Sequence, residues 1–279
     1  MARIYLRFPQ GRAKALTLSY DDGVEQDMRL VEILDSYGLK GTFNLNSGLY
    51  APEGTVYPSG QIHRRMTKKQ VLRTFLGSGH EVACHSLTHP YLDKLPPAMA
   101  AREIIKDREN LERQFGTIVR GMAYPYGTYS DSVVEMLKSC GIVYARTVES
   151  TNSFRIPTDW LRLNPTCHHD SPELMALAEK FAGGEASRDP WLFYLWGHSY
   201  EFEANGNWHV IEEFARHTGS RDDIWYATNI EIYDYIDDYN RLQFSVEGNR
   251  AQNPTARTLW FEMDGRLFDI APGQTMEIS

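Results

Sequence analysis

Short apolar stretches alternate with helical stretches along most of this 279-residue chain, and this alternation restricts the fold more than any other feature. Parallel strands need a crossover long enough to hold a helix, so regular alternation is typical of a parallel sheet covered by helices. No internal repeat, low-complexity tract or flexible linker divides the chain before Arg241. We therefore expect one α/β domain over residues 1–241, large enough to bury a substantial core.

Apolar patterning, caps and glycine stops predict where the individual elements lie. The predicted strands cover residues 16–20, 40–44, 80–84, 118–124, 142–148, 161–163, 191–196 and 224–226. The predicted helices cover residues 24–37, 67–76, 96–115, 130–139, 172–181, 208–217 and 230–239. The stretch 46–65 holds glycines, prolines and tyrosines and is predicted to form a long loop.

Beyond Arg241 the pattern changes to the alternation of short strands. These strands are predicted at residues 243–247, 258–263, 266–270 and 275–278, with Asp264-Gly265 as a hairpin turn. Residues 242–279 are too few to form a stable domain alone. We expect them to form a C-terminal β extension that packs on the larger domain, either covering it or lengthening a cleft.

Two adjacent acids follow the first apolar strand directly. Asp21 and Asp22 end that strand, and Gly23 then releases the backbone into a turn before the next helix. α/β barrels and open α/β sheets carry their chemistry at the carboxyl ends of strands. The alternative interpretation is a helix N-cap with a spare acid beside it.

Two histidines lie four residues apart at the end of another predicted strand. One helical turn or a tight loop lets the imidazoles of His85 and His89 face the same point. Zinc and similar ions bind two or three protein nitrogens or oxygens and keep an open position. Together with one carboxylate of the acidic pair, these histidines predict a mononuclear divalent-metal site.

Four short motifs resemble those of the polysaccharide deacetylases, which are carbohydrate esterase family 4 and share the NodB homology domain. They are Ser19-Tyr-Asp-Asp-Gly23, His85-Ser-Leu-Thr-His89, Tyr124-Pro-Tyr-Gly127 and Leu195-Trp-Gly-His198, in the order of the family. The resemblance implies a distorted (β/α) barrel. It also implies a hydrolase that removes acetyl groups from an N-acetyl amino sugar or an O-acetyl polysaccharide with one divalent metal ion, zinc first and cobalt, nickel or manganese as alternatives.

The resemblance also assigns roles to the residues of the first two motifs. It implies that Asp21 is the general base and that Asp22, His85 and His89 hold the metal ion. A division of labour is physically reasonable, because a metal-bound carboxylate stays ionised whereas its neighbour must accept a proton. The alternative is a solvated acidic turn.

The later motifs supply the remaining expected roles. The resemblance implies that Tyr126 presents its backbone N–H to the developing oxyanion and that His198 is the general acid. A plain Pro-Gly turn and a buried core histidine are the alternatives. Ser86 is expected to hydrogen-bond within its loop, and His168 and His169 are expected near the rim of the site rather than as ligands.

The chain departs from the family pattern beside the expected base. The family has an Arg three residues before the motif Tyr, where this chain has Ala123, so Asp21 lacks its usual partner. We predict that Arg146 replaces that cation, because a charge in so apolar a strand is costly unless it is paired. The alternative is that Arg146 reaches a surface carboxylate. The family's Asp and Trp that orient the acid histidine are also not recognisable, with Glu149 and Asp159-Trp160 as loose candidates.

Further side chains are assigned more simply. Aromatic residues near strand ends are candidates for sugar-stacking faces: Trp160, Trp196, Tyr200 and Trp208. The remaining histidines of interest are expected on the surface: His63, His209 and His217.

Different functions fit parts of the sequence. Gly197-His-Ser-Tyr-Glu201 follows an apolar strand as a nucleophile elbow does, which would make Ser199 the nucleophile of a serine hydrolase. Glu201 however replaces the second glycine of that motif. The sequence is also compatible with a sugar-binding protein without turnover, and with a hydrolase of the same fold that acts on a small cyclic amide.

Composition restricts the partners. The net charge is −8 and there is no basic run, so we expect no nucleic-acid partner. The resemblance to the deacetylases implies a carbohydrate substrate. No apolar run approaches the roughly 20 residues of a membrane span. The first residues lack the apolar core of a signal peptide, and the chain has only three cysteines, so we expect a cytoplasmic protein. If a leader was removed, the protein is instead secreted or at the cell surface.

Overall fold

A parallel sheet forms the centre of the computed structural model, which describes residues 3–186 and 188–278. Its strands are β2 (Lys14–Asp21), β3 (Gly41–Leu45), β4 (Glu81–Cys84), β5 (Gly121–Ala123), β6 (Tyr144–Arg146), β7 (Cys167–His168), β8 (Trp191–Gly197) and β9 (Ile224–Tyr226). The order is β6-β5-β4-β3-β2-β8-β7, and β9 also pairs with β2. All of these pairings are parallel, as the alternation of the sequence predicts.

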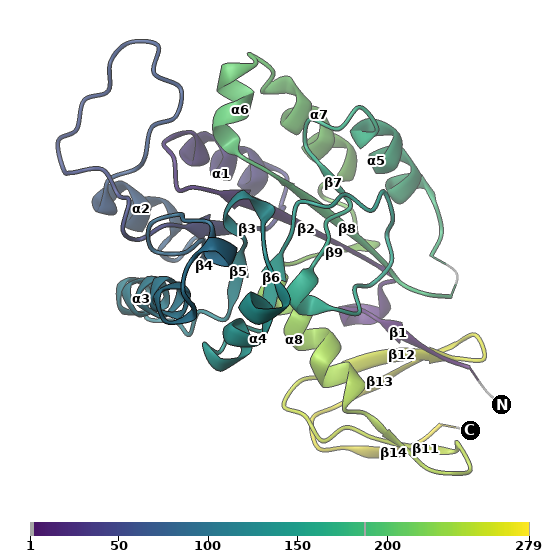
Figure 1. Ribbon diagram of the computed structural model, residues 1–279. Helices are drawn as coiled ribbons and strands as arrows, with labels where there is room; N and C mark the ends of the chain where they lie inside the picture. Colours follow the sequence, from purple (N-terminus) through teal and green to yellow (C-terminus); the bar gives the residue numbers. More distant parts are fainter. Residues whose placement is uncertain (1–2, 187, 279) are drawn as a thin grey trace.

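Helices cover the outside of this sheet, which curves into a half-barrel (Figure 1). They are α1 (Gln26–Ser36), α2 (Lys68–Phe75), α3 (Pro97–Phe115), α4 (Asp131–Ser139), α5 (Leu174–Gly183), α6 (Ser199–Ala204), α7 (His209–Thr218) and α8 (Asn229–Asn240). The predicted distorted (β/α) barrel is therefore confirmed. Within the described residues, no helix has both the length and the apolar character that a membrane span needs.

Local capping explains why several helix boundaries were predictable. The Thr67 hydroxyl accepts the Gln70 N–H at 3.2 Å, and the Gln70 side chain accepts the Thr67 N–H at 2.7 Å, which is a capping box at the start of α2. The Ser130 hydroxyl caps α4 by accepting the Val133 N–H at 3.3 Å, without a reciprocal bond. Helix α6 was not predicted, because six residues are too few to show helical periodicity.

The predicted strand at residues 161–163 is wrong. Residues Trp160–Arg162 form a short 3-10 helix instead, because the Asp159 carboxylate accepts the Leu161 N–H at 3.1 Å and caps a turn. The chain then closes the gap between β6 and β8. Leu163 donates to the Ala145 carbonyl at 2.9 Å, and Thr166 donates to the Tyr194 carbonyl at 2.8 Å, before the unpredicted strand β7 begins.

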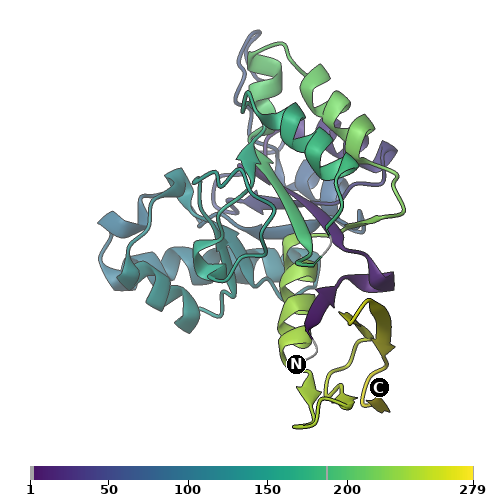
Figure 2. The same ribbon diagram turned by 90° about the vertical axis from the view of Figure 1, so that its right-hand side faces the viewer.

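The C-terminal residues form two small antiparallel sheets (Figures 1 and 2). One contains β1 (Ile4–Arg7), β12 (Leu259–Met263) and β13 (Arg266–Ile270), and the other contains β10 (Gln243–Phe244), β11 (Arg250–Gln252) and β14 (Thr275–Glu277). Their apolar side chains pack with Phe8, Ala15 and Leu192 and with buried residues of α8. Because Ala15 and Leu192 lie at the amino ends of β2 and β8, the extension covers the end of the barrel opposite to the carboxyl ends of the strands.

The Tyr235 hydroxyl joins the three parts of this interface. It donates to the Arg7 carbonyl at 2.7 Å and accepts the Trp260 N–H at 3.0 Å, and the side chain is 1% exposed. We expect Tyr235→Phe to lower the free energy of unfolding by about 1–3 kcal/mol, because two buried backbone groups lose their partner. Urea denaturation measures this loss. Tyr57→Phe, which removes a hydrogen bond from the more exposed loop, is the control, and an equal loss in both variants would contradict the assignment.

Candidate active site

A cavity of about 450 Å³ lies at the carboxyl ends of the strands and gathers most of the predicted site residues. Its lining comprises Asp21, Asp22, His63, Arg65, His85, His89, Tyr124, Tyr126, Gly127, Val148, Trp196, His198 and Tyr200. These residues come from the end of β2, from the turns after β4, β5 and β6, from the end of β8 and from the loop at residues 46–67. That loop projects at the upper left of Figure 1, and its last residues return to the cavity.

The Asp21 carboxylate is almost fully buried and has a partner on each oxygen. Asn44 donates to Oδ1 at 2.8 Å, and the Arg146 guanidinium makes a short ion pair with Oδ2. Arg146 also lies 4.2 Å above the ring centre of Trp196, which fixes its plane. Burial alone would raise the pKa of Asp21, but Arg146 and then His85 outweigh it, so this pKa lies below its usual value.

Asp22 has a different set of partners. Arg65 donates to Oδ1 at 2.9 Å, and the Nε2 atom of His63 lies 3.2 Å from Oδ2. Burial acts against ionisation here too, but the contacts with His63 and Arg65 hold the pKa of Asp22 well below its usual range. His63 is at the surface as expected, with 42% of its side chain exposed, but its imidazole also lines the cavity, which was not predicted.

His85 and His89 direct the same ring nitrogen towards each other. Their Nε2 atoms are 3.1 Å apart, and the His89 Nε2 atom is 3.9 Å from Asp22 Oδ1. The His85 Nδ1–H donates to the Ala123 carbonyl at 2.8 Å, which leaves Nε2 without the proton and available to a cation. Burial lowers the pKa of His85, and burial with the neighbouring His85 lowers the pKa of His89 to about 4, so both rings are neutral near pH 7.

These three residues fit a divalent metal ion. One ligand atom from each of Asp22, His85 and His89 lies within 4.8 Å of the others, and one carboxylate with two neutral imidazoles is a usual ligand set for zinc. The carbonyl that holds His85 belongs to Ala123. The residue at the family's Arg position thus contributes to the site through its backbone.

Neighbouring polar groups hold this loop in place. The buried Asp107 carboxylate of α3 accepts the His85 N–H at 3.1 Å and the Ser47 N–H at 2.8 Å. Burial raises the pKa of Asp107 to about 7. The Ser86 hydroxyl accepts the His89 N–H at 3.1 Å, which is the hydrogen bond expected within this loop.

Backbone strain is concentrated around the cavity. Four non-glycine residues here have positive φ: Asp22 at 85°, Ser86 at 62°, His89 at 55° and Tyr126 at 58°. Such conformations cost about 1–3 kcal/mol each, and they persist where the surrounding structure fixes them. The strain therefore indicates that these side chains are held in set directions.

His198 and Tyr126 lie on different sides of the acidic pair. The Nε2 atom of His198 is 3.9 Å from Asp21 Oδ2, and the Tyr126 ring packs edge-on against His89 with the ring centres 4.4 Å apart. Burial would lower the pKa of His198, but the contact with Glu201 and the charge of Asp21 outweigh it and raise this pKa. The catalytic roles of both residues stay predictions.

Several other expectations do not match the cavity. His168 and His169 lie behind His198 and are not part of its lining, and Trp160 and Trp208 pack elsewhere, on Tyr233 and Phe202. Trp196 and Tyr200 do line it.

The serine hydrolase hypothesis does not match the cavity either. Ser199 is fully buried and donates to the Asp27 carboxylate at 2.6 Å, so a substrate cannot reach it as a nucleophile.

Sequence reasoning missed four contributors: His63, Arg65, Asn44 and Glu201. His63 and Arg65 could have been found, because they end the loop that was predicted at residues 46–65. Polar side chains on a loop that covers a site often contribute to that site. Glu201 follows His198 by three residues, which is a capping-box spacing, but it was interpreted only as a departure from a serine motif. Asn44 had no signal in the sequence.

Comparison with known proteins identifies relatives of this part of the chain. The polysaccharide deacetylase family model matches residues 9–145. A chitooligosaccharide deacetylase of Sinorhizobium fredii is 24% identical over 153 residues, which is 54% of this chain and 61% of that relative. An uncharacterised protein of Streptomyces coelicolor is 30% identical over 45% of this chain and 44% of its own length. The matched stretches thus span less than two thirds of the curated relatives.

Solved structures share the fold at low sequence identity. A Mycobacterium smegmatis protein assigned to the polysaccharide deacetylases aligns with a TM-score of 0.57 and 16% identity, over 84% of this chain and 94% of that one. A family 4 carbohydrate esterase from Streptomyces lividans, solved in complex with acetate, aligns with a TM-score of 0.51 and 16% identity, over 77% and 92% of the two chains. These likenesses support the architecture described above.

We expect Asp22→Ala and His85→Ala to lose the metal ion, because each change removes one of three ligands. Metal analysis after gel filtration measures the bound ion per chain. His217→Ala, on α7 and away from the cavity, is the control that keeps its metal. Full metal content in both ligand variants would overturn the assignment.

We expect Arg146→Met to lower the free energy of unfolding by about 3–5 kcal/mol at pH 7, because it leaves the buried Asp21 charge unpaired. The folded pKa of Asp21 is depressed, so its ion pair stabilises the protein above the unfolded-state pKa and this contribution is lost as the pH falls. The difference between variant and parent should therefore shrink at acidic pH.

Urea titrations in the presence of chelator, at neutral and acidic pH, test this expectation. Arg120→Met removes the half-exposed ion pair with Asp234 and is the matched control, with an expected loss of about 0–1 kcal/mol. A loss in Arg146→Met no larger than in the control, or one independent of pH, would show that the pair does not stabilise the fold.

Proposed function

Because the chain belongs to the polysaccharide deacetylase family, we propose that it is a metal-dependent hydrolase that removes acetyl groups from a carbohydrate. The substrate class is an N-acetyl amino sugar or an O-acetylated polysaccharide. The observation that carries the proposal is that one cavity is lined by an ionised carboxylate and a protonatable imidazole, Asp21 and His198, next to a metal-ligand set.

Asp21 has the properties that a general base needs. Its lowered pKa keeps the carboxylate ionised at neutral pH, and Asn44 and Arg146 fix the direction of both oxygens. A carboxylate held in this way can accept the proton of a water molecule that attacks the acetyl carbonyl. Because Asp22 is engaged by Arg65 and His63 and belongs to the ligand set, Asp21 is the acid left for this task.

His198 has the complementary properties. Its raised pKa favours the imidazolium, which can protonate the departing sugar nitrogen or oxygen as the tetrahedral intermediate collapses. Asp22, His85 and His89 would hold the divalent ion, and the ion would polarise the acetyl carbonyl as a Lewis acid. The Tyr126 N–H, at a strained turn that lines the same cavity, is the proposed donor to the oxyanion.

We expect Asp21→Asn and His198→Ala each to lower kcat by about 10²–10⁴-fold, because each removes one proton-transfer group. Both variants should keep their metal ion, since neither residue belongs to the ligand set. Acetate release is measured together with metal content, and Glu212→Gln on the exposed face of α7 is the control. Near-parental kcat in either variant would refute the role of that residue.

A substrate panel tests the reaction itself. The zinc-loaded protein is assayed for acetate release from chitin oligomers, peptidoglycan and acetylated xylan, and for ring opening of a small cyclic amide. Acetate release that disappears on chelation and resists serine-directed fluorophosphonates supports the proposal. Turnover of the cyclic amide alone would favour the cyclic-amide hydrolase of the same fold.

A further inference from the structure

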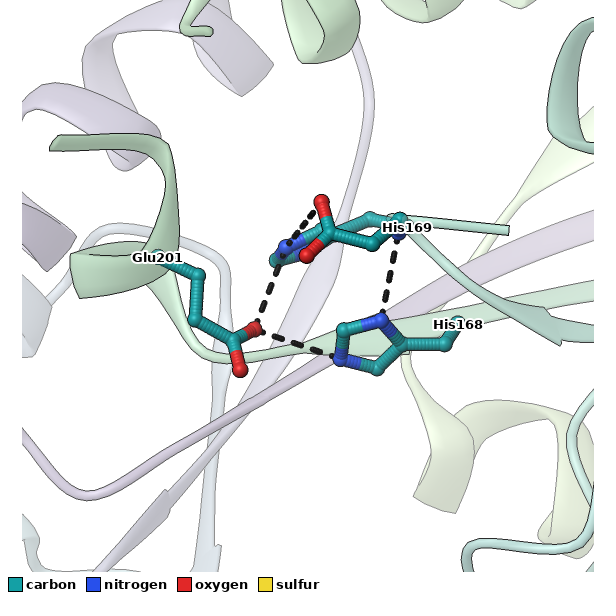
Figure 3. Close-up of side chains that lie close together, drawn as sticks. His168, His169 and Glu201 are labelled. Carbon is teal, nitrogen blue, oxygen red and sulfur yellow. Dashed lines mark hydrogen bonds and ion pairs between the residues drawn. The ribbon is translucent and has the colours of Figure 1, made fainter. Parts of the chain in front are cut away.

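Three imidazoles converge on the carboxylate of Glu201, outside the proposed metal site. The Nε2 atoms of His168 and His169 are each 3.2 Å from Glu201 Oε2, and the His198 Nδ1 atom is 3.4 Å from Oε1 (Figure 3 shows the first two contacts). Glu201 lies in the first turn of α6, and both other histidines lie at the end of β7. The cluster therefore ties the end of β7 to the start of α6, directly behind the proposed general acid.

Glu201 touches His198 twice. Its Oε2 atom accepts the His198 backbone N–H at 3.2 Å, and its Oε1 atom faces the ring nitrogen Nδ1. The other ring nitrogen of His198, Nε2, faces Asp21 Oδ2 at 3.9 Å at the edge of the cavity. A ring contact of 3.4 Å is long, but catalytic hydrogen bonds commonly tighten only when substrate is bound.

A second metal site is the obvious competing interpretation of this cluster. His168, His169, Asp170 and Glu201 offer ligand atoms within 4.8 Å of one another. The His168 Nδ1 atom however accepts the Asp170 backbone N–H at 3.1 Å. A neutral imidazole that accepts at Nδ1 carries its proton on Nε2, so the His168 nitrogen that faces Glu201 is a hydrogen-bond donor and offers no lone pair to a cation.

His169 has a similar orientation. Its ring is fully buried between Tyr20 and Phe202, with ring centres 5.7 and 4.1 Å away, and Gly197 leaves room for it because a Cβ there would lie 2.0 Å from His169 Nδ1. Packing thus directs its Nε2 atom towards Glu201 Oε2, at 3.2 Å, and Asp170 Oδ1 lies 3.4 Å from the same nitrogen.

We propose that Glu201 is the positioning residue that keeps the proton on Nδ1 of His198 and stabilises its imidazolium, and that His168 and His169 hold Glu201 in place as an anion. This role takes the place of the family's Asp and Trp, which this chain lacks in recognisable form. Asp159, one of the loose candidates, instead pairs with Arg162 at 2.7 Å. The proposal rests on the proposed function only in naming His198 as the acid.

The charges around the two groups agree with this role. Burial would raise the pKa of Glu201, but the contacts with His168, His169 and His198 hold it well below its usual range. Groups from three parts of the chain face His198. Glu201 and Tyr200 come from α6, and His168 comes from β7. Asp21 and Asp22 come from the end of β2, whereas the Arg146 guanidinium lies against the ring of Trp196. Among these anions, only Glu201 contacts the Nδ1 side of the ring.

Glu201→Gln is the test, because Gln keeps the size and can still accept the His198 N–H as a capping-box residue. The general acid must be protonated, so activity is lost as the pH rises through the pKa of His198. Without the anion this pKa falls. The basic limb of kcat/KM should therefore move to lower pH, and the value on that limb should drop by about 10–100-fold.

Histidine NMR of the zinc-loaded protein reads the same property without turnover. The His198 resonance is identified by its loss in His198→Ala, and its titration is compared in the parent, Glu201→Gln and the control Glu212→Gln. A lower pKa only in Glu201→Gln, with unchanged zinc content, supports the proposal. Unchanged titration overturns it, as does the loss of a second equivalent of zinc in Glu201→Gln, which would establish a metal site.

The two proposals fail separately. If no acetylated sugar is turned over, the proposed function fails, and the NMR titration still decides the role of Glu201. If Glu201→Gln does not fold, Glu201→Asp is measured instead. This variant keeps the charge but withdraws it by one methylene, so the pKa of His198 should fall by less than in Glu201→Gln. An unchanged His198 titration in that variant overturns the proposal.

Discussion

Two adjacent carboxylates are buried at the end of β2, and the surrounding structure must compensate their charge. Asp21 is 2% exposed and Asp22 is 8% exposed. An unpaired buried charge costs several kcal/mol, so each acid can stay ionised only with partners in place. β3 and β6 supply Asn44 and Arg146 to the first acid, and the loop at residues 46–67 supplies the partners of the second. The site and the fold are therefore assembled together.

The direction of the chain at Asp22 explains how both acids serve one cavity. Successive side chains of a strand point to opposite faces, so a regular strand would separate Asp21 from Asp22. The φ of 85° at Asp22 ends the strand abruptly and brings both carboxylates to the same cavity. Their neighbours then differ. Asp21 faces the Arg146 guanidinium and the Nε2 atoms of His85 and His198, at 3.7 and 3.9 Å, whereas Asp22 faces Arg65, His63 and His89.

Much of this arrangement could be predicted, and the failures have physical causes. The family's Arg is replaced by Ala123, and the cost of burying an unpaired cation in an apolar strand predicted that Arg146 takes its place. The guanidinium of Arg146 does contact Asp21. The strand β1 was missed because its partner β12 lies about 250 residues later, and four residues show no clear periodicity. The contact of His63 with Asp22 was missed because an irregular loop has no repeat from which the direction of a side chain can be inferred.

The start of α6 shows how a short helix can carry a chemical function. His198 occupies the N-cap, where burial and the unpaired N–H groups of the first turn both disfavour a positive charge. An imidazolium at this point needs an anion nearby. The residue that accepts the N-cap N–H, Glu201, lies close enough to supply that anion. The Nε2 atoms of His168 and His169 approach the Oε2 atom of this carboxylate from the end of β7, each at 3.2 Å, and restrict its rotation. Glu201 therefore both caps the first turn of α6 and counteracts burial and the unpaired N–H groups, which would otherwise lower the pKa of His198.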